Sequence, residues 1–252
     1  MAARSLHEAA LKGEIDEVVQ LLGALGDDGV NAEDEYGAAP LWYACSARPE
    51  KPEIVVALLE RSASVHHCAP AGDLPLHACA REHNVAVMEL LIEHKADVNF
   101  CGNADYTPLK VAITGPVGVR KADGHDAVVE STKGQLQLRA VGLLLDANAD
   151  PNATQSESAA YCEPPLFVAA RCGHVAVIER LLAAAADVNF PDKRGRTALD
   201  QVLNRRYASP FKLDRPYLHA ICCCRCCRCR CRRRRRRRCC YMCKATLLCS
   251  RS

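Results

Sequence analysis

One short motif recurs through most of this chain, and its spacing constrains the fold more than any other feature. It contains a leucine followed by small or aromatic residues, as in Pro40-Leu-Trp-Tyr-Ala-Cys45 and Pro75-Leu-His-Ala-Cys-Ala80. The marker leucines are separated by 35, 35, 33, 57 and 33 residues, and they are Leu6, Leu41, Leu76, Leu109, Leu166 and Leu199. A period of this length indicates a solenoid of repeated supersecondary units.

Two further motifs follow the markers in register. Segments such as Val87-Met-Glu-Leu-Leu91 have the spacing of an amphipathic helix. Turn sequences such as Ala96-Asp-Val-Asn99 and Ala186-Asp-Val-Asn189 then redirect the chain, because Asn bonds readily to nearby backbone. Thr107-Pro108 predicts an N-cap with proline at the first helical position. Between the two helices of a unit we expect a residue with positive φ, which we assign to Gly13, Gly173 and, in the third unit, Asn84.

Together these motifs resemble the ankyrin-repeat family over about residues 5–203. The resemblance implies an all-α ankyrin-repeat solenoid in which helix pairs are joined by projecting β-turn fingers. We expect a domain over 1–205 with five repeats, at about 1–36, 37–70, 71–103, 104–160 and 161–193, and a short C-terminal cap at 194–205. A linker over 206–221 and a disordered Cys/Arg-rich tail over 222–252 follow.

The fourth unit is about 20 residues longer than its neighbours between Leu109 and Asn152. We place this insertion near 115–138, between the two helices of the unit, and four more residues in the finger that follows Asn152. Such additions either serve binding or are tolerated surface loops, and both interpretations stay open. In the second unit, extra residues at Arg48–Pro52 predict a longer turn between the helices.

Charge divides the chain into an acidic body and a basic tail. The tail from Cys222 onward carries twelve positive charges and no acid, which leaves −9 on the first 221 residues of a chain whose net charge is +3. Eleven of the 17 cysteines also lie there. We weigh a zinc cluster, a nuclear or nucleic-acid-binding signal, a lipidated basic stretch, and a translated repeat or shifted reading frame without function. We favour the last interpretation.

The body carries no signature of secretion, membrane insertion or catalysis. Met1 to Gly13 lacks an apolar signal core, no run is long enough to span a bilayer, and the six body cysteines have no framework spacing. We therefore expect a monomeric cytoplasmic protein, with the nucleus as the alternative. Phosphate-binding loops and hydrolase or kinase motifs are missing from the sequence, so we expect no enzyme, no cofactor and no metal. The His66-His67-Cys68 cluster is interpreted as part of a finger turn and not as a metal site.

The resemblance also implies roles for single residues. In this family the histidine of the Pro-Leu-His-Ala motif makes structural hydrogen bonds between neighbouring repeats, a role that falls to His77 and, in the first unit, to His7. Family members bind partners on the concave face formed by fingers and first helices. We call the corresponding set here the finger face, and its candidate binding residues are Tyr36, Trp42, Arg81, Tyr106, Tyr161, Arg171 and Arg194.

Trp42 has two interpretations of equal weight, packing between repeats or binding a partner. Tyr36, Trp42, Tyr106 and Tyr161 are predicted to form an aromatic line flanked by acids, with a basic end at the sixth unit. Asn99 and Asn189 match the family asparagines that undergo β-hydroxylation, which would make the chain a substrate of a hydroxylase.

These inferences predict a protein-interaction scaffold or adaptor without catalytic chemistry. The alternative function is a nuclear or nucleic-acid-associated regulator, in which nucleic acid binds only through the arginine run of the tail. The identity of the protein partner is not encoded in any motif of the sequence.

Overall fold

The computed structural model of the chain describes residues 2–26, 29–48, 50–69, 72–102, 106–115, 132–154, 163–192 and 194–202, which all lie in one compact unit formed by residues 1–212. The predicted linker and tail, most of the predicted insertion and Tyr161 lie outside the described residues. Within the described ranges the chain forms helices and no strand.

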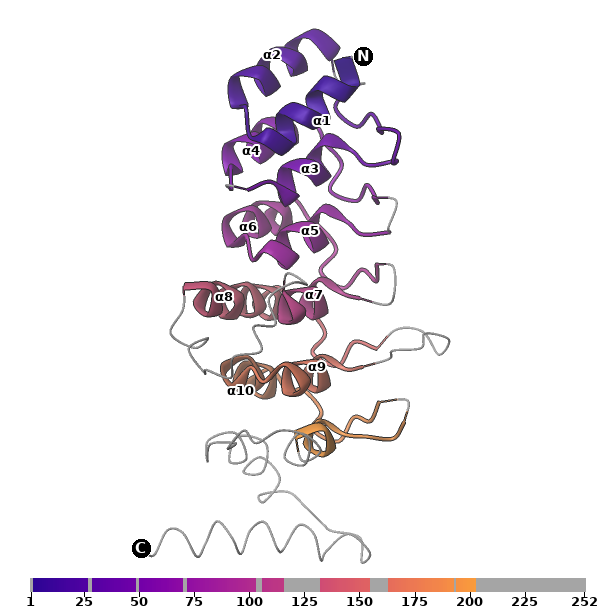
Figure 1. Cartoon of the computed structure of the whole chain (residues 1–252), viewed down its shortest axis with the longest axis vertical. Helices are drawn as coiled ribbons and strands as arrows, with labels where there is room; N and C mark the ends of the chain where they lie inside the picture. Colours follow the sequence, from indigo (N-terminus) through magenta and orange to yellow (C-terminus); the bar gives the residue numbers. More distant parts are fainter. Residues whose placement is uncertain are drawn as a thin grey trace, which may run out of the picture. The chain divides into compact units, whose positions relative to one another are not determined.

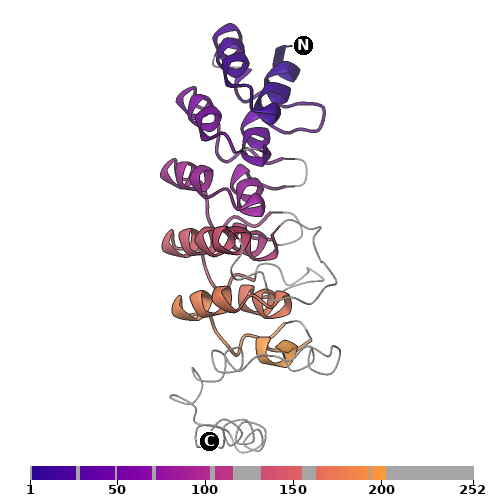
Figure 2. The same cartoon turned by 60° about the vertical axis from the view of Figure 1, so that its left-hand side comes forward.

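Five helix pairs stack in chain order, and each pair is one repeat (Figures 1 and 2). The first helices lie in one row and the second helices in another, with the finger segments projecting beside the first row. The pairs are α1 (Ala2–Lys12) with α2 (Ile15–Leu25), α3 (Pro40–Ser46) with α4 (Pro52–Glu60), α5 (Pro75–Glu82) with α6 (Val85–Glu93), α7 (Pro108–Thr114) with α8 (Thr132–Asp146), and α9 (Pro165–Cys172) with α10 (Val175–Ala183). The predicted all-α ankyrin-repeat solenoid is therefore confirmed.

The helices begin where the sequence places proline and capping residues. Pro40, Pro75, Pro108 and Pro165 stand at the start of the first helices, where a missing N–H costs no hydrogen bond. Thr107 caps α7, and its side chain accepts a hydrogen bond from the Lys110 amide, as predicted. The core between the two rows consists mainly of small and branched apolar side chains, including the marker leucines Leu6, Leu41, Leu76, Leu109 and Leu166.

The turn between the helices of the third repeat corrects one prediction. Gly13 and Gly173 do have positive φ, at 77° and 89°. In the third repeat, however, His83 has this conformation, with φ of 59°, whereas Asn84 has φ of −76° and caps α6 by accepting from the Val87 amide. His83 stands seven residues after its marker leucine, as Gly13 and Gly173 do after theirs. The sequence predicts the turn one residue too late because Asn tolerates positive φ better than His.

Part of the insertion predicted near 115–138 in the fourth repeat is helical. Helix α8 begins at Thr132, so residues 132–138 are helical instead of forming the end of a loop. Gln137 explains why helix continues here: its buried amide donates to the carbonyl oxygens of Ala112 (3.2 Å) and Ile113 (2.7 Å) at the C-terminal end of α7. The longer turn of the second repeat is confirmed, because α3 ends at Ser46 and α4 begins at Pro52.

After the fifth pair, residues 198–202 form a further helix, which corresponds to the first helix of a sixth repeat. Thr197 and Asp200 cap it reciprocally: the Thr197 amide donates to the Asp200 carboxylate (3.0 Å), and the Asp200 amide donates to the Thr197 hydroxyl (3.4 Å). None of the helices in the described ranges has the length and apolarity that crossing a lipid bilayer requires.

Candidate functional site

The fingers at the two ends of the described stack are shaped by aspartates. Asp34 accepts hydrogen bonds from the amides of Tyr36 and Ala38, both at 2.9 Å. Asp192 does the same for the amides of Arg194 (3.0 Å) and Arg196 (2.7 Å). Each carboxylate thus stabilises a turn in which the third residue after the aspartate is a glycine with positive φ, Gly37 or Gly195. The side chains of Glu35, Tyr36 and Arg194 in these turns are exposed to solvent.

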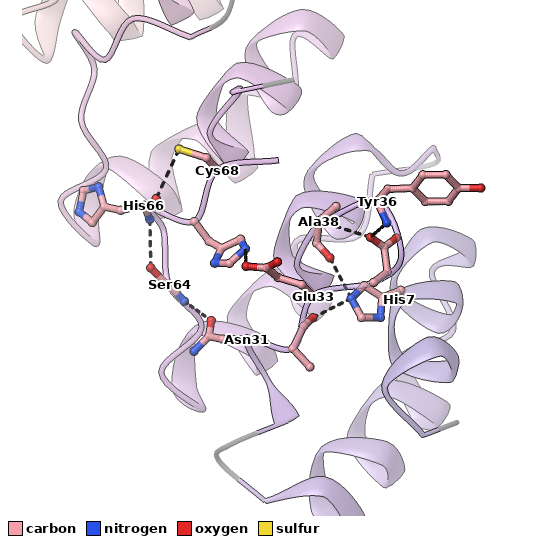
Figure 3. Close-up of polar contacts among 11 residues, drawn as sticks. His7, Asn31, Glu33, Tyr36, Ala38, Ser64, His66 and Cys68 are labelled. Atoms are coloured by element: carbon pink, nitrogen blue, oxygen red, sulfur yellow. Dashed lines mark hydrogen bonds and ion pairs between the residues drawn. The ribbon is translucent and has the colours of Figure 1, made fainter. Parts of the chain in front are cut away.

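Tyr36 is the most exposed large apolar side chain of the described residues, with 66% of its surface accessible. Figure 3 shows its ring pointing away from the polar contacts of the same finger. Glu33 and Glu35 flank the finger and are exposed too. This finger therefore offers an aromatic ring beside carboxylates, a combination that suits contact with a polar or cationic partner group.

Tyr43 and Asp34 form a polar pair beneath this finger that the sequence interpretation missed. The Tyr43 hydroxyl donates to the second carboxylate oxygen of Asp34 at 2.6 Å, and this bond raises the pKa of Tyr43 to about 12. Burial raises the pKa of Asp34, but the hydrogen bonds from Tyr43, Ala38 and Tyr36 outweigh it and hold that pKa below its ordinary value. The Tyr43 ring also meets those of His7 and Trp42 edge to face, at 5.7 and 5.3 Å.

Trp42 lies partly buried on α3. Its indole nitrogen is buried and has no hydrogen-bond partner. The packing against Tyr43 agrees with a structural role, while the exposed remainder of the ring leaves it accessible to a partner.

Two candidate arginines, Arg81 and Arg171, and the neighbouring Arg196 form ion pairs with carboxylates of their own repeats. Arg81 binds Asp73 (2.7 Å), and Arg171 binds Glu163 (3.2 Å), in each case across eight residues of sequence. Arg196, in the last finger, binds Asp192 at 2.6 Å and lies over the Phe167 ring at 5.3 Å. Burial of Asp192 raises its pKa, but the hydrogen bonds from Arg196 more than offset this and lower it. These arginines are partly exposed and fixed in orientation, which limits the entropy lost when they contact a partner.

Tyr106 lies where the third and fourth repeats meet. Its carbonyl oxygen accepts a hydrogen bond from His77 Nε2 at 3.0 Å, and the ammonium of buried Lys110 lies 5.6 Å from its ring centre. His7 makes the equivalent contacts at the joint between the first and second repeats, to the carbonyl oxygens of Ala32 (2.9 Å) and Ala38 (3.0 Å). The inter-repeat roles expected of His77 and His7 are confirmed.

The predicted aromatic line is described only in part. Tyr161 lies outside the described residues, Tyr36 projects from the first finger, and Trp42 and Tyr106 are engaged with Tyr43 and Lys110 respectively. Asp34 could have been found from sequence, because Asp34-Glu-Tyr-Gly37 and Asp192-Lys-Arg-Gly195 share one pattern. The contact of Tyr43 with Asp34 has no such signal.

Of the two candidate hydroxylation residues, Asn99 has a well-defined environment. Its side-chain oxygen accepts from the Asp150 amide (2.8 Å), and its side-chain nitrogen donates to the Asn148 carbonyl (3.1 Å), so it bridges to the fourth repeat. Asn189 is exposed, and its amide donates to the Asp187 carboxylate at 2.8 Å.

The His66-His67-Cys68 cluster belongs to the second finger. His67 lies 3.3 Å from the Glu33 carboxylate, and the Cys68 thiol faces the His66 carbonyl oxygen (Figure 3). Throughout the part of the chain that the structure describes, no three His, Cys, Asp or Glu side chains gather in an arrangement that could hold a metal ion.

Known proteins resemble the chain in the same regions. The family model for ankyrin repeats in three copies matches residues 47–122, and the model for a single ankyrin repeat matches residues 163–193. Ankyrin repeat and SOCS box protein 5 of Oryctolagus cuniculus is 33% identical over 125 residues, which cover 50% of this chain and 36% of that protein.

Two other relatives cover more of the chain. Neurogenic locus notch homolog protein 1 of Mus musculus is 28% identical over 182 residues, 68% of this chain and 6% of that protein. Ankyrin repeat protein nuc-2 of Neurospora crassa is 27% identical over 194 residues, 77% of this chain and 16% of that protein. The chain thus spans about a third or less of each of these relatives. The stacked helix pairs, the recurrent motifs and these matches agree, and the chain belongs to the ankyrin-repeat family.

Proposed function

We propose that the chain is a non-catalytic scaffold or adaptor that binds a protein partner on its finger face. Ankyrin repeats generally mediate protein–protein interaction, which supports the class of function. The observation that carries the choice of surface is the first finger, where Tyr36 is 66% exposed beside Glu33 and Glu35. An exposed tyrosine on a turn whose shape is fixed by hydrogen bonds is a typical interface anchor.

Charge along the fingers supports a directional interaction. The first finger carries Glu33, Asp34 and Glu35, whereas the last finger carries exposed Arg194 and partly exposed Arg196. A partner segment with its basic end at the first finger and its acidic end at the last would be complementary to both. Such complementarity orients a partner and speeds association more than it strengthens binding.

The test begins with affinity capture of a partner by the full chain. Binding to that partner is then measured for single alanine variants at Tyr36, Trp42, Tyr106 and Tyr161. We expect Tyr36→Ala to weaken binding by about tenfold or more, as for an interface anchor. The control is Val56→Ala, since Val56 is exposed on the second-helix row at α4. Unchanged affinity in all four finger-face variants would remove the proposal.

The alternative function assigns nucleic-acid binding to the tail, on the evidence of the unbroken arginine run from Arg232 to Arg238. Arginines neutralise phosphates without reading bases, so such binding weakens steeply with salt. Deletion of the residues after Ile221 should then abolish nucleic-acid binding and nuclear localisation while leaving partner binding intact. If deletion changes neither, the tail has no such role and the cytoplasm is the expected compartment of the monomer.

A further inference from the structure

Two kinds of polar bridge join consecutive repeats of this stack. In the first kind, at the joints after the first and third repeats, a histidine after the marker leucine bonds the backbone of the finger that leads into the next repeat. His7 does so with Ala32 and Ala38, and His77 with Tyr106. The Leu74 amide donates to His77 Nδ1 at 3.2 Å, so Nε2 carries the proton and donates to the Tyr106 carbonyl.

In the second kind, the asparagine that ends the turn after a second helix bonds the equivalent turn of the next repeat. Asn31 accepts from the Ser64 amide (2.7 Å) and donates to the Ser62 carbonyl (3.2 Å), and the contact with Ser64 is visible in Figure 3. Asn99 makes the same two bonds to Asp150 and Asn148. Asn152 accepts from the Asp187 amide at 2.7 Å.

The joint between the second and third repeats carries residues that cannot make either bridge in this way. Trp42 occupies the position of His7 and His77, and its buried indole nitrogen has no hydrogen-bond partner among the residues that the structure describes. His66 occupies the position of Asn31 and Asn99. In the described part of the chain its ring makes no hydrogen bond to the third repeat, and Figure 3 shows the ring turned away from Asn31 and Ser64.

Among the described residues, apolar packing, a contact between two buried thiols and one ion pair hold this joint. Cys45 of α3 and Cys79 of α5 are both fully buried, and burial, with the Cys45 thiol beside it, raises the pKa of the Cys79 thiol. Arg48 pairs with Glu82 across the joint, but more than half of the Arg48 side chain is exposed, and such pairs contribute little. By comparison, the joint before it has both polar bridges and also a bond from the Arg61 guanidinium to the Leu22 carbonyl (3.2 Å).

We infer that the stack opens first at the joint between the second and third repeats, so that α1–α4 and the helices from α5 onward behave as two cooperative units. The stability of a repeat protein is a sum of terms for each repeat and each joint, so a joint that lacks both kinds of bridge opens more easily than the joints on either side of it, which have both. This inference goes beyond the proposed function and has a consequence for it. The finger face crosses this joint, and a partner that contacts fingers on both sides will hold it closed.

Hydrogen exchange followed by mass spectrometry on the full chain tests the inference. We expect peptides from α1 to α4 to exchange at one common rate, with a step to slower exchange between α4 and α5. Simple fraying predicts a different order, in which α1 and α2 exchange before α3 and α4. That order, or equal rates in α4 and α5, would overturn the inference.

Restoring a bridge gives a second, independent measurement. His66→Asn places an amide opposite the turn of the third repeat, and since His66 is exposed its replacement removes little packing. We expect exchange in α1–α4 to slow by about tenfold for two added hydrogen bonds, while α9 and α10 stay unchanged. His66→Ala is the matched control and should leave the rates as they are.

The reverse substitution, Asn99→His, removes the bridge between the third and fourth repeats. It should speed exchange in α5 and α6 and move the step toward α7. If His66→Asn slows nothing, or if His66→Ala slows exchange as much, the missing asparagine does not weaken the joint and the inference is wrong.

Discussion

The carbonyl oxygen of Tyr106 accepts a hydrogen bond from Nε2 of His77, 3.0 Å away, and this bond connects the finger before the fourth repeat to the first helix of the third. His77 is fully buried, so its ring must form both of its hydrogen bonds within the protein. His77 therefore has two structural roles. It fixes a finger that belongs to the candidate binding face, and it fixes the register between the third and fourth repeats.

Replacing His77 by leucine should destabilise the fold. The variant leaves the Leu74 amide and the Tyr106 carbonyl without their partner, which costs about 2–4 kcal/mol for two buried groups. Urea unfolding followed by circular dichroism measures the loss. His94→Leu is the control, because His94 is exposed and bonds only within its own helix turn. Equal losses in the two variants would contradict the role of His77.

Stability should fall as the solution becomes acidic through the buried histidines. Burial lowers the pKa of His77 and of His83, whose Nε2 bonds the Ala112 carbonyl at 2.8 Å. The unfolded chain binds protons near the ordinary value of 6.5, whereas the folded chain resists protonation until a lower pH. These histidines therefore contribute their full share of the unfolding free energy above pH 6.5. That contribution is lost as the pH falls below 6.5.

Unfolding free energies measured from pH 7.5 to pH 5 check this dependence. The double variant His77→Gln, His83→Gln should show a shallower decline over the same range, about pH 6.5 to 5, than the parent chain. An identical slope in both proteins would show that other groups cause the decline.

The Asp34–Tyr43 hydrogen bond should be visible in the titration of the phenol. The absorbance difference between the parent chain and Tyr43→Phe isolates Tyr43, which should ionise near 12. In an Asp34→Asn background the same difference should ionise closer to 10, the ordinary value, because the carboxylate charge is gone. A Tyr43 titration that does not respond to this substitution would exclude the hydrogen bond.

Two glycines should respond in opposite directions to alanine. At Gly102 a Cβ atom would lie 2.5 Å from the Asp73 carboxylate and 3.2 Å from His77 Nε2, so Gly102→Ala should destabilise the fold by about 1–3 kcal/mol. At Gly23, within α2, a Cβ atom meets nothing within 4 Å, so Gly23→Ala should stabilise by about 0.5–1 kcal/mol. Thermal unfolding of both variants gives the direction of each stability change. A change in the same direction for both variants would refute the packing at Gly102.

Hydroxylation at Asn99 and Asn189 should leave the stack intact. The modification replaces a hydrogen on Cβ, and the amide groups with which Asn99 holds Asp150 and Asn148 stay available. Co-expression with an asparaginyl hydroxylase should add the mass of one oxygen per site with no fall in the unfolding temperature. An unchanged intact mass would show that neither asparagine is a substrate.

The sequence was sufficient to predict the solenoid because each structural repeat carries the same motifs at nearly the same spacing. It identified the marker leucines, the Thr107 cap and the inter-repeat histidines. It was misleading at His83, since propensity favours Asn for positive φ and the packing of the imidazole against the Ala112 carbonyl is a tertiary contact. It also missed the start of α8, where Gln137 satisfies carbonyls from another helix. The pairing of Arg81 with Asp73 and of Tyr43 with Asp34 depends on side-chain geometry that periodicity does not encode.

The most direct test of the central claim is a hydrogen-exchange footprint of the full chain with the partner recovered by affinity capture. The account predicts that added partner protects the finger around Tyr36 and the start of α3, with no change in the outer turns of α4 and α6. Protection confined to the second helices, with the first finger exchanging as it does in the free chain, would contradict it.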